Sequence, residues 1–187
     1  MTEPKTNQSE SLLPVSPSQT IGPFFHDVMV LTGTNVVSSA DVAGEAVRIE
    51  GRVLDGKGDP VDDALLEAWQ VEGAVHEGTD GSALVRSDTA DEGRFSFTVM
   101  KPGASSGRSA PFVLVRLFAR GLLRSLVTRI YFESAPDDPV MQSIAPRRQE
   151  TLIAERDDSS DPPTYRIDIH LQGERETVFF DLQGGNR

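Results

Sequence analysis

The stretch that decides the fold is Glu50-Gly-Arg-Val-Leu-Asp-Gly-Lys-Gly-Asp-Pro-Val-Asp-Asp-Ala-Leu-Leu-Glu-Ala-Trp-Gln70. Just before and within it, Val47, Ile49 and Val53 alternate with charged residues, which is the period of a half-buried β-strand. The run Asp55–Pro60 that follows is made of residues that favour turns. The stretch is therefore predicted to form a strand, a tight turn and a second strand.

Similar patterns recur along the rest of the chain. Phe95, Phe97 and Val99 share one face of a predicted strand, and the two apolar segments after it have the composition of core strands. Further strands are predicted at 112–118, 126–132, 165–171 and 177–180. One short helix is predicted over 138–144, because an N-cap candidate, Asp138, is followed by a proline at the first helical position.

Short strands separated by turn signals at this spacing predict an all-β protein, folded as a sandwich of antiparallel sheets with one short helix. Residues 1–18 have no hydrophobic period and are expected to form an N-terminal arm. Residues 19–187 contain no internal repeat and no linker, so they are expected to form a single domain.

Composition narrows the possible partners of this 187-residue chain. Its net charge of −11 argues against binding to nucleic acid or to an anionic membrane surface, because both attract clustered Lys and Arg. The polar first ten residues and the lack of a membrane-length apolar run predict a cytoplasmic protein. The absence of cysteine excludes disulfides, thiolate catalysis and Cys-ligated metals.

Several segments, in the order in which they occur, resemble the intradiol ring-cleaving dioxygenases, and in particular the alpha-type subunit of the two-subunit members. These segments are Ser16–Phe24, Glu50–Gln70, Phe118–Leu123, Thr128–Phe132 and His170–Asp181. The resemblance runs over nearly the whole chain. It implies a reaction in which O2 cleaves a catechol ring between its two hydroxyls, with protocatechuate as the expected substrate and 3-carboxy-cis,cis-muconate as the product.

The resemblance also implies where a metal site has been lost. Catalytic members hold Fe(III) with two tyrosinates and two histidines, and the histidines form a His-x-His pair on one strand, where residues two apart face the same way. The matching positions here are Phe112 and Leu114, and the matching tyrosines are also missing. We therefore expect no metal on this chain, with the Fe(III) cofactor bound by a catalytic beta subunit in a hetero-oligomer.

The same resemblance indicates what this chain contributes to a shared site. The matching alpha-type residues, Thr20, Gly22, Pro23 and Arg120, are expected to line part of the substrate pocket at the interface with the beta subunit. Their chemistry suits that role: Gly-Pro allows a close and fixed backbone approach, the Thr hydroxyl can donate or accept a hydrogen bond, and arginine stays cationic beside carboxylates.

Two other functions remain open from the sequence. Accessory β-sandwich binding modules have a similar strand-turn-strand pattern, although they would not need the arm motif or the segment 170–181. A self-sufficient homo-oligomeric dioxygenase is disfavoured by the missing ligands. Trp69 is expected to lie in the core with Leu65, and His26, His76 and His170 have no metal-ligand spacing among themselves.

Overall fold

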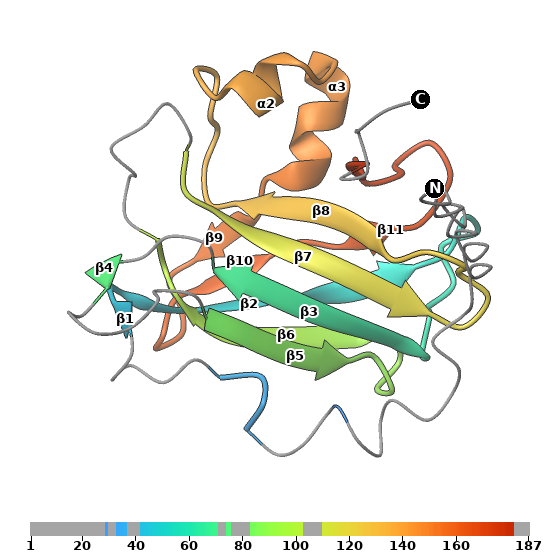
Figure 1. Ribbon diagram of the computed structural model, residues 1–187, viewed down its shortest axis with the longest axis horizontal. Coiled ribbons are helices and arrows are strands. Elements are labelled where there is room, and N and C mark those ends of the chain that lie inside the picture. The colour runs from blue at the N-terminus through green and yellow to red at the C-terminus, as the bar shows by residue number, and fades with distance from the viewer. Residues whose placement is uncertain are drawn as a thin grey trace, which may run out of the picture.

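The computed structural model describes residue 29 and residues 33–36, 42–70, 74–75, 83–102 and 110–181. Its strands are β1 Val42–Ala43, β2 Ala46–Leu54, β3 Ala64–Gln70, β4 Ala74–Val75, β5 Ala83–Asp88, β6 Arg94–Met100, β7 Phe112–Ala119, β8 Leu126–Tyr131, β9 Glu155–Asp157, β10 Thr164–Arg166 and β11 Ile169–His170. Its helices are α2 Pro139–Gln142, α3 Pro146–Gln149 and the 3₁₀ turn η1 Glu150–Leu152 (Figure 1).

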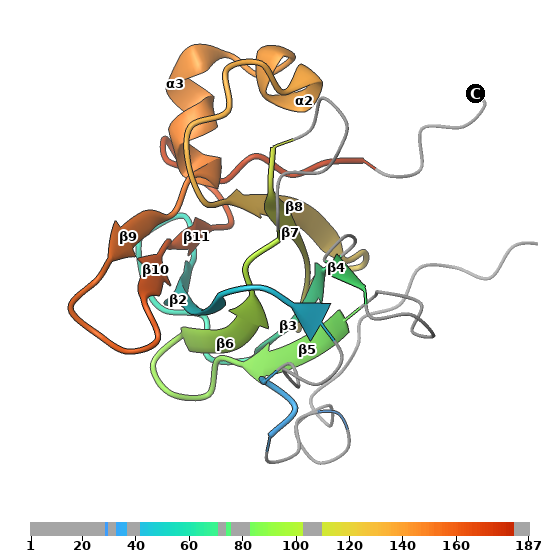
Figure 2. The ribbon, with the colours of Figure 1, turned by 90° about the vertical axis from the view of Figure 1, so that its left-hand side faces the viewer.

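Two sheets pack face to face, as the view along the sandwich shows (Figure 2). One sheet has the order β5-β3-β7-β8 and is antiparallel throughout. In the other, β6 pairs antiparallel with one edge of β2, while β10 and β11 pair with its opposite edge in parallel. The predicted β-sandwich is confirmed, and the parallel pairs are an addition that the strand pattern did not indicate.

The main core lies between the two sheets and is built from the alternation read in the sequence. Val47, Ile49 and Val53 of β2 are fully buried, and they face Val113 and Leu117 of β7, which belong to the same cluster. Burying one such side chain stabilises the fold by about 1.5–3 kcal/mol. The period of two in these strands therefore sets which face of each sheet is internal.

The predicted turn between the first two strands forms around Asp55. Its carboxylate oxygen Oδ1 accepts hydrogen bonds from the backbone N–H groups of Lys57 at 2.8 Å and Asp59 at 2.9 Å. These two bonds lower the pKa of Asp55 from its usual value, because they stabilise the ionised carboxylate. Gly58 has a φ of 88°, a conformation that glycine adopts without strain.

The helical region is larger than the sequence predicted. Asp138 caps α2 as expected, with its Oδ1 accepting from the N–H groups of Val140 and Met141. The additional elements α3 and η1 follow directly, and the helices pack on the end of β8 through a second apolar cluster (Figure 1). This cluster contains Tyr131, Met141 and Leu152.

Two strand predictions near the end of the chain were wrong. The predicted strand 165–171 is divided into β10 and β11, because the backbone passes close over Gly51 between them: an added Cβ on Gly51 would lie 1.7 Å from the carbonyl oxygen of Ile167. Residues 177–180 form no strand but run along β8, where the Phe180 N–H donates to the Val127 carbonyl at 2.7 Å and the Thr128 hydroxyl donates to the Val178 carbonyl at 2.8 Å. An alternating pattern alone could not distinguish a continuous ladder from these isolated contacts.

Candidate functional site

Strand β7 carries the two features that the sequence singled out, one at each end. Phe112 and Leu114 lie at its start, and Arg120 follows its last residue. At roughly 3.3 Å per residue, Phe112 and Arg120 are on the order of 26 Å apart along the strand. The lost ligand positions and the predicted pocket arginine are therefore two separate places.

Phe112 and Leu114 point to the outer face of the β5-β3-β7-β8 sheet, not into the core between the sheets. Their neighbours Val113 and Val115 are fully buried inside, so the even-numbered residues face outward, and both side chains are only half-buried. Neither side chain therefore belongs to the main core, although two apolar residues at these positions would suggest that a former metal cavity had become core. Phe112 instead packs against the second cluster beside the helices.

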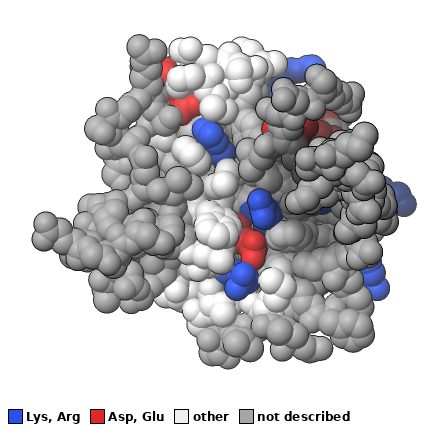
Figure 3. Space-filling view, in the orientation of Figure 1, with Lys and Arg blue, Asp and Glu red and all other residues white. Residues whose placement is uncertain are grey.

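Trp69 lies on this outer face as well, because it pairs with Leu114 across β3 and β7. It is half-buried and does not belong to the main core, so its expected core position was also wrong. On the same face of β3, Glu67 is only 7% exposed and forms an ion pair with Arg86 at 2.8 Å. Figure 3 views this face, and the part of it formed by described residues is mainly uncharged with a few charged side chains within it.

Arg129 is a charged residue directly beside the lost ligand positions. It pairs with Leu114 across β7 and β8, and its guanidinium carbon lies 4.1 Å from the centre of the Phe112 ring. The Phe180 ring lies 5.6 Å from the same carbon. A guanidinium close to aromatic rings is stabilised by cation–π attraction of about 0.5–2 kcal/mol.

A hydrogen-bond chain links Arg129 to a buried carboxylate. The Arg129 Nη1 donates to the Tyr131 hydroxyl at 3.1 Å, and this hydroxyl donates to Asp138 Oδ1 at 3.4 Å. Asp138 is 1% exposed, and its Oδ2 accepts from the Ala110 N–H at 3.0 Å. Burial raises the pKa of Tyr131, while the bond from Arg129 acts in the opposite direction. The phenol therefore stays protonated and donates to Asp138 at neutral pH.

The residues at the lost ligand positions do not fit a metal ion. Phe112 and Leu114 carry no donor atoms, and the adjacent Arg129 is a permanent cation. Within the part of the chain that the structure describes, no group of three or more His, Cys, Asp or Glu side chains is arranged to hold a metal. Chemistry that depends on iron cannot be assigned to these side chains.

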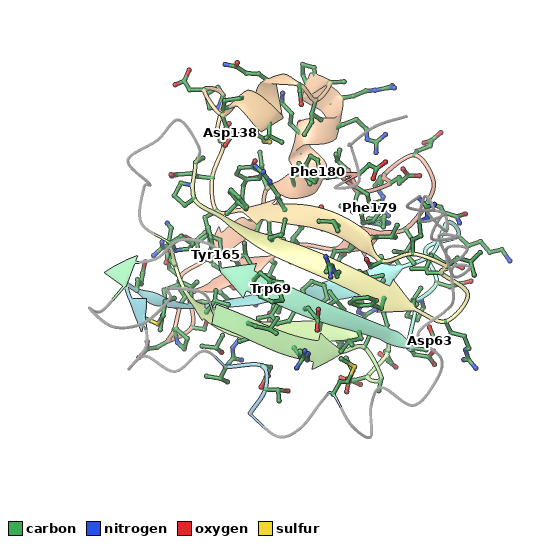
Figure 4. All side chains as sticks on the ribbon, viewed as in Figure 1. Asp63, Trp69, Asp138, Tyr165, Phe179 and Phe180 are labelled. Atoms are coloured by element: carbon green, nitrogen blue, oxygen red, sulfur yellow. The ribbon has the colours of Figure 1, made fainter. Side chains whose placement is uncertain are left out.

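Arg120 lies at the other end of β7, in a turn that continues into Gly121 with φ of 89°. Its side chain is 64% exposed, and its Nε donates to Asp63 Oδ2 at 2.8 Å. Asp63 ends the loop before β3 and was not predicted as part of the site. Figure 4 shows Asp63 and Asp138 at opposite ends of the sandwich. Thr20, Gly22 and Pro23 lie outside the described residues.

The structure also contains an open groove of about 1670 Å³ on the other sheet. It runs past β2 and β6 to the segment after β11 and includes His170, which is 9% exposed. Burial lowers the pKa of His170, with a smaller contribution from Arg175. Arg120 does not line this groove, and among the described residues its wall contains both arginine and carboxylate side chains.

Among the residues that the structure describes, no helix is both long and apolar enough to cross a membrane.

Comparison with known proteins places this geometry in a family. The family described as Dioxygenase matches residues 21–173. The chain belongs to the intradiol dioxygenase family.

Curated relatives of this dioxygenase extend over nearly the full chain. It is 36% identical to the protocatechuate 3,4-dioxygenase alpha chain of Burkholderia cepacia, with 89% of this chain and 97% of the relative covered. It is also 36% identical to the alpha chain of Pseudomonas putida, with 91% and 98% covered. The beta chain of Burkholderia cepacia is 29% identical, with 92% of this chain and 82% of the relative covered.

Solved structures confirm the fold. The dioxygenase domain of a carbohydrate-binding fusion protein from Streptomyces sp. SirexAA-E aligns with a TM-score of 0.56 and 20% identity, covering 91% of this chain and 99% of that one. Catechol 1,2-dioxygenase from Pseudomonas arvilla C-1 aligns with a TM-score of 0.52 and 18% identity, covering 81% and 62%.

Proposed function

We propose that this chain is the alpha subunit of a protocatechuate 3,4-dioxygenase and works in a complex with a catalytic beta subunit. The observation that carries the proposal is the similarity to alpha chains over about nine-tenths of the sequence, together with apolar residues at both ligand positions of β7. That similarity also favours the subunit over an accessory binding module, because the chain covers 97% of its first relative.

The reaction of such a complex inserts both atoms of O2 into protocatechuate and opens the ring between the two hydroxyls. Fe(III) on the beta subunit would supply the redox chemistry. The alpha chain's own residues would bind and orient the substrate and exclude water from it. Substrate orientation contributes to the rate because it reduces the entropy that must be lost at the transition state.

Arg120 is the described residue best suited to contact the substrate. Its guanidinium has five N–H donors, and the bond to Asp63 uses one of them, so a carboxylate or phenolate can be bound by the others. Asp63 fixes the side chain at one end, which reduces the entropy lost on binding. We include Thr20, Gly22 and Pro23 as the remaining residues of this pocket wall.

The test is Arg120→Ala in the complex co-expressed with its beta subunit. The kcat/KM for protocatechuate should fall at least tenfold, because the loss of roughly 1.4 kcal/mol of transition-state interaction corresponds to a factor of ten. Iron content should not change. Asp63→Asn should give a smaller decrease, because Arg120 keeps its charge but loses its fixed orientation.

Arg116→Ala is the matched control, since it removes an exposed arginine from the same strand. It should change kcat/KM by less than about twofold if the effect of Arg120 comes from its position. Full activity of the Arg120→Ala complex with intact iron would refute the pocket role. The alpha assignment itself predicts no stoichiometric iron on this chain expressed alone, and one tightly bound iron per chain would contradict it.

A further inference from the structure

Arg129 lies opposite one of the two lost ligand positions and reaches the other with its guanidinium. Phe112 and Leu114 share one face of β7, about 6–7 Å apart as are any two residues separated by one along a strand. Arg129 is paired with Leu114 in the register, yet its guanidinium lies over the Phe112 ring. Its side chain therefore extends across the gap between the two positions.

The position of this guanidinium is determined by contacts from three elements. Phe112 on β7 and Phe180 in the C-terminal segment lie close to it, at 4.1 Å and 5.6 Å from their ring centres, and Tyr131 accepts its hydrogen bond. The C-terminal segment is itself attached to β8, because the Thr128 hydroxyl donates to the Val178 carbonyl at 2.8 Å. Arg129 is thus confined on several sides.

Asp138 anchors the other end of this arrangement. Its carboxylate is nearly fully buried and receives three backbone N–H donors and the Tyr131 hydroxyl. A buried negative charge is stabilised by a nearby cation, and Arg129 is connected to it through a single phenol. The positive charge of Arg129 is therefore part of the local structure and not an incidental surface charge.

We propose that Arg129 keeps this face of β7 free of metal, because its guanidinium holds a fixed positive charge over the Phe112 ring, within a few ångströms of any ion bound at positions 112 and 114. Two like charges a few ångströms apart repel each other strongly at a partly buried site. Restoring the two histidines alone would then be insufficient to bind a metal. The proposal deepens the assignment as an iron-free subunit and rests on it.

The experiment uses the full chain with two histidines introduced, Phe112→His and Leu114→His, in three backgrounds: Arg129 retained, Arg129→Leu and Arg129→Lys. Co2+ affinity is measured by isothermal titration calorimetry and by the visible absorption of bound Co2+. Arg129→Leu should bind Co2+ at least tenfold more tightly than the variant with Arg129 retained. The Arg129→Lys variant keeps the positive charge, so its Co2+ affinity should be as low as that of the variant with Arg129 retained.

Arg116→Leu in the two-histidine chain is the matched control, because it removes an arginine from the same face without contact to the Phe112 ring. It should change Co2+ affinity by less than threefold. Circular dichroism and thermal unfolding establish that each variant is folded. Equal affinity with and without Arg129, or no binding by a folded Arg129→Leu variant, would overturn the proposal. Stoichiometric iron on the unaltered chain would instead refute the proposed alpha-subunit function.

Discussion

Replacement of Gly51 by alanine should destabilise this protein severely, although Gly51 lies on an ordinary strand. The added Cβ would lie 1.7 Å from the Ile167 carbonyl oxygen and 3.2 Å from the Phe95 ring. Because the Ile167 oxygen belongs to the backbone, the segment between β10 and β11 has to move by on the order of 1.5 Å to reach van der Waals contact.

The magnitude follows from what that movement breaks. Two hydrogen bonds hold this segment to β2: the Ile167 N–H to the Glu50 carbonyl at 3.1 Å, and the Arg52 N–H to Asp168 Oδ1 at 2.9 Å. Each contributes about 0.5–1.5 kcal/mol. Overpacking costs about 1–3 kcal/mol more. We expect Gly51→Ala to lower the free energy of unfolding by about 2–6 kcal/mol, which is a large part of the stability of a typical domain.

Urea unfolding followed by circular dichroism measures this change. Gly58→Ala is the matched control: its φ of 88° disfavours alanine, but an added Cβ would meet no atom within 4 Å. That variant should lose only about 1–2 kcal/mol, the cost of the backbone conformation. A loss below about 1 kcal/mol for Gly51→Ala would show that the segment over β2 moves freely, and would refute the reasoning.

Two further predictions concern carboxylates. Asp138→Ala should cost about 2–4 kcal/mol in urea unfolding, because the cap of α2 is lost and the Tyr131 hydroxyl loses its acceptor; Asp138→Asn, which keeps an acceptor, should cost less than half as much. Hydrogen bonds from Ser159, and then from Arg166, lower the pKa of Asp157 from 3.8 to about 2. Because the folded-state pKa is the lower one, the stabilising contribution of Asp157 is complete above about pH 4 and is lost as the pH falls through about 2. The Asp157→Asn variant should therefore show a flatter pH dependence of stability between about pH 4 and pH 2. An unchanged pH dependence of stability in the Asp157→Asn variant would contradict this role of Asp157.

The sequence by itself determined the features that depend on neighbours along the chain. The alternation around Val47–Val53 gave the buried face of β2, Asp55 and Gly58 gave the turn, and Asp138 with its following proline gave the start of α2. Each of these features depends on a hydrophobic period within one strand, a hydrogen bond between residues close in sequence, or a fixed backbone φ angle. The motifs that carry the family resemblance were equally accessible, because they are read in order along the chain.

The tertiary structure decided everything that depends on which segments meet. Only the crossing of residue 167 over β2 explains why residue 51 is glycine and why a single predicted strand becomes β10 and β11. Only the register of β3, β7 and β8 places Trp69 and Leu114 on the outer face, with Arg129 opposite Leu114.

The contacts of the two candidate site regions, around Arg120 and around Arg129, also depend on which distant segments meet. Arg120 meets Asp63 across 57 positions of sequence, and Arg129 reaches Asp138 only through Tyr131. The family resemblance indicated Arg120 as a candidate, but no local pattern could indicate which carboxylate it would contact. Such pairs arise from the packing of distant strands, so their chemistry becomes visible only when the chain is folded.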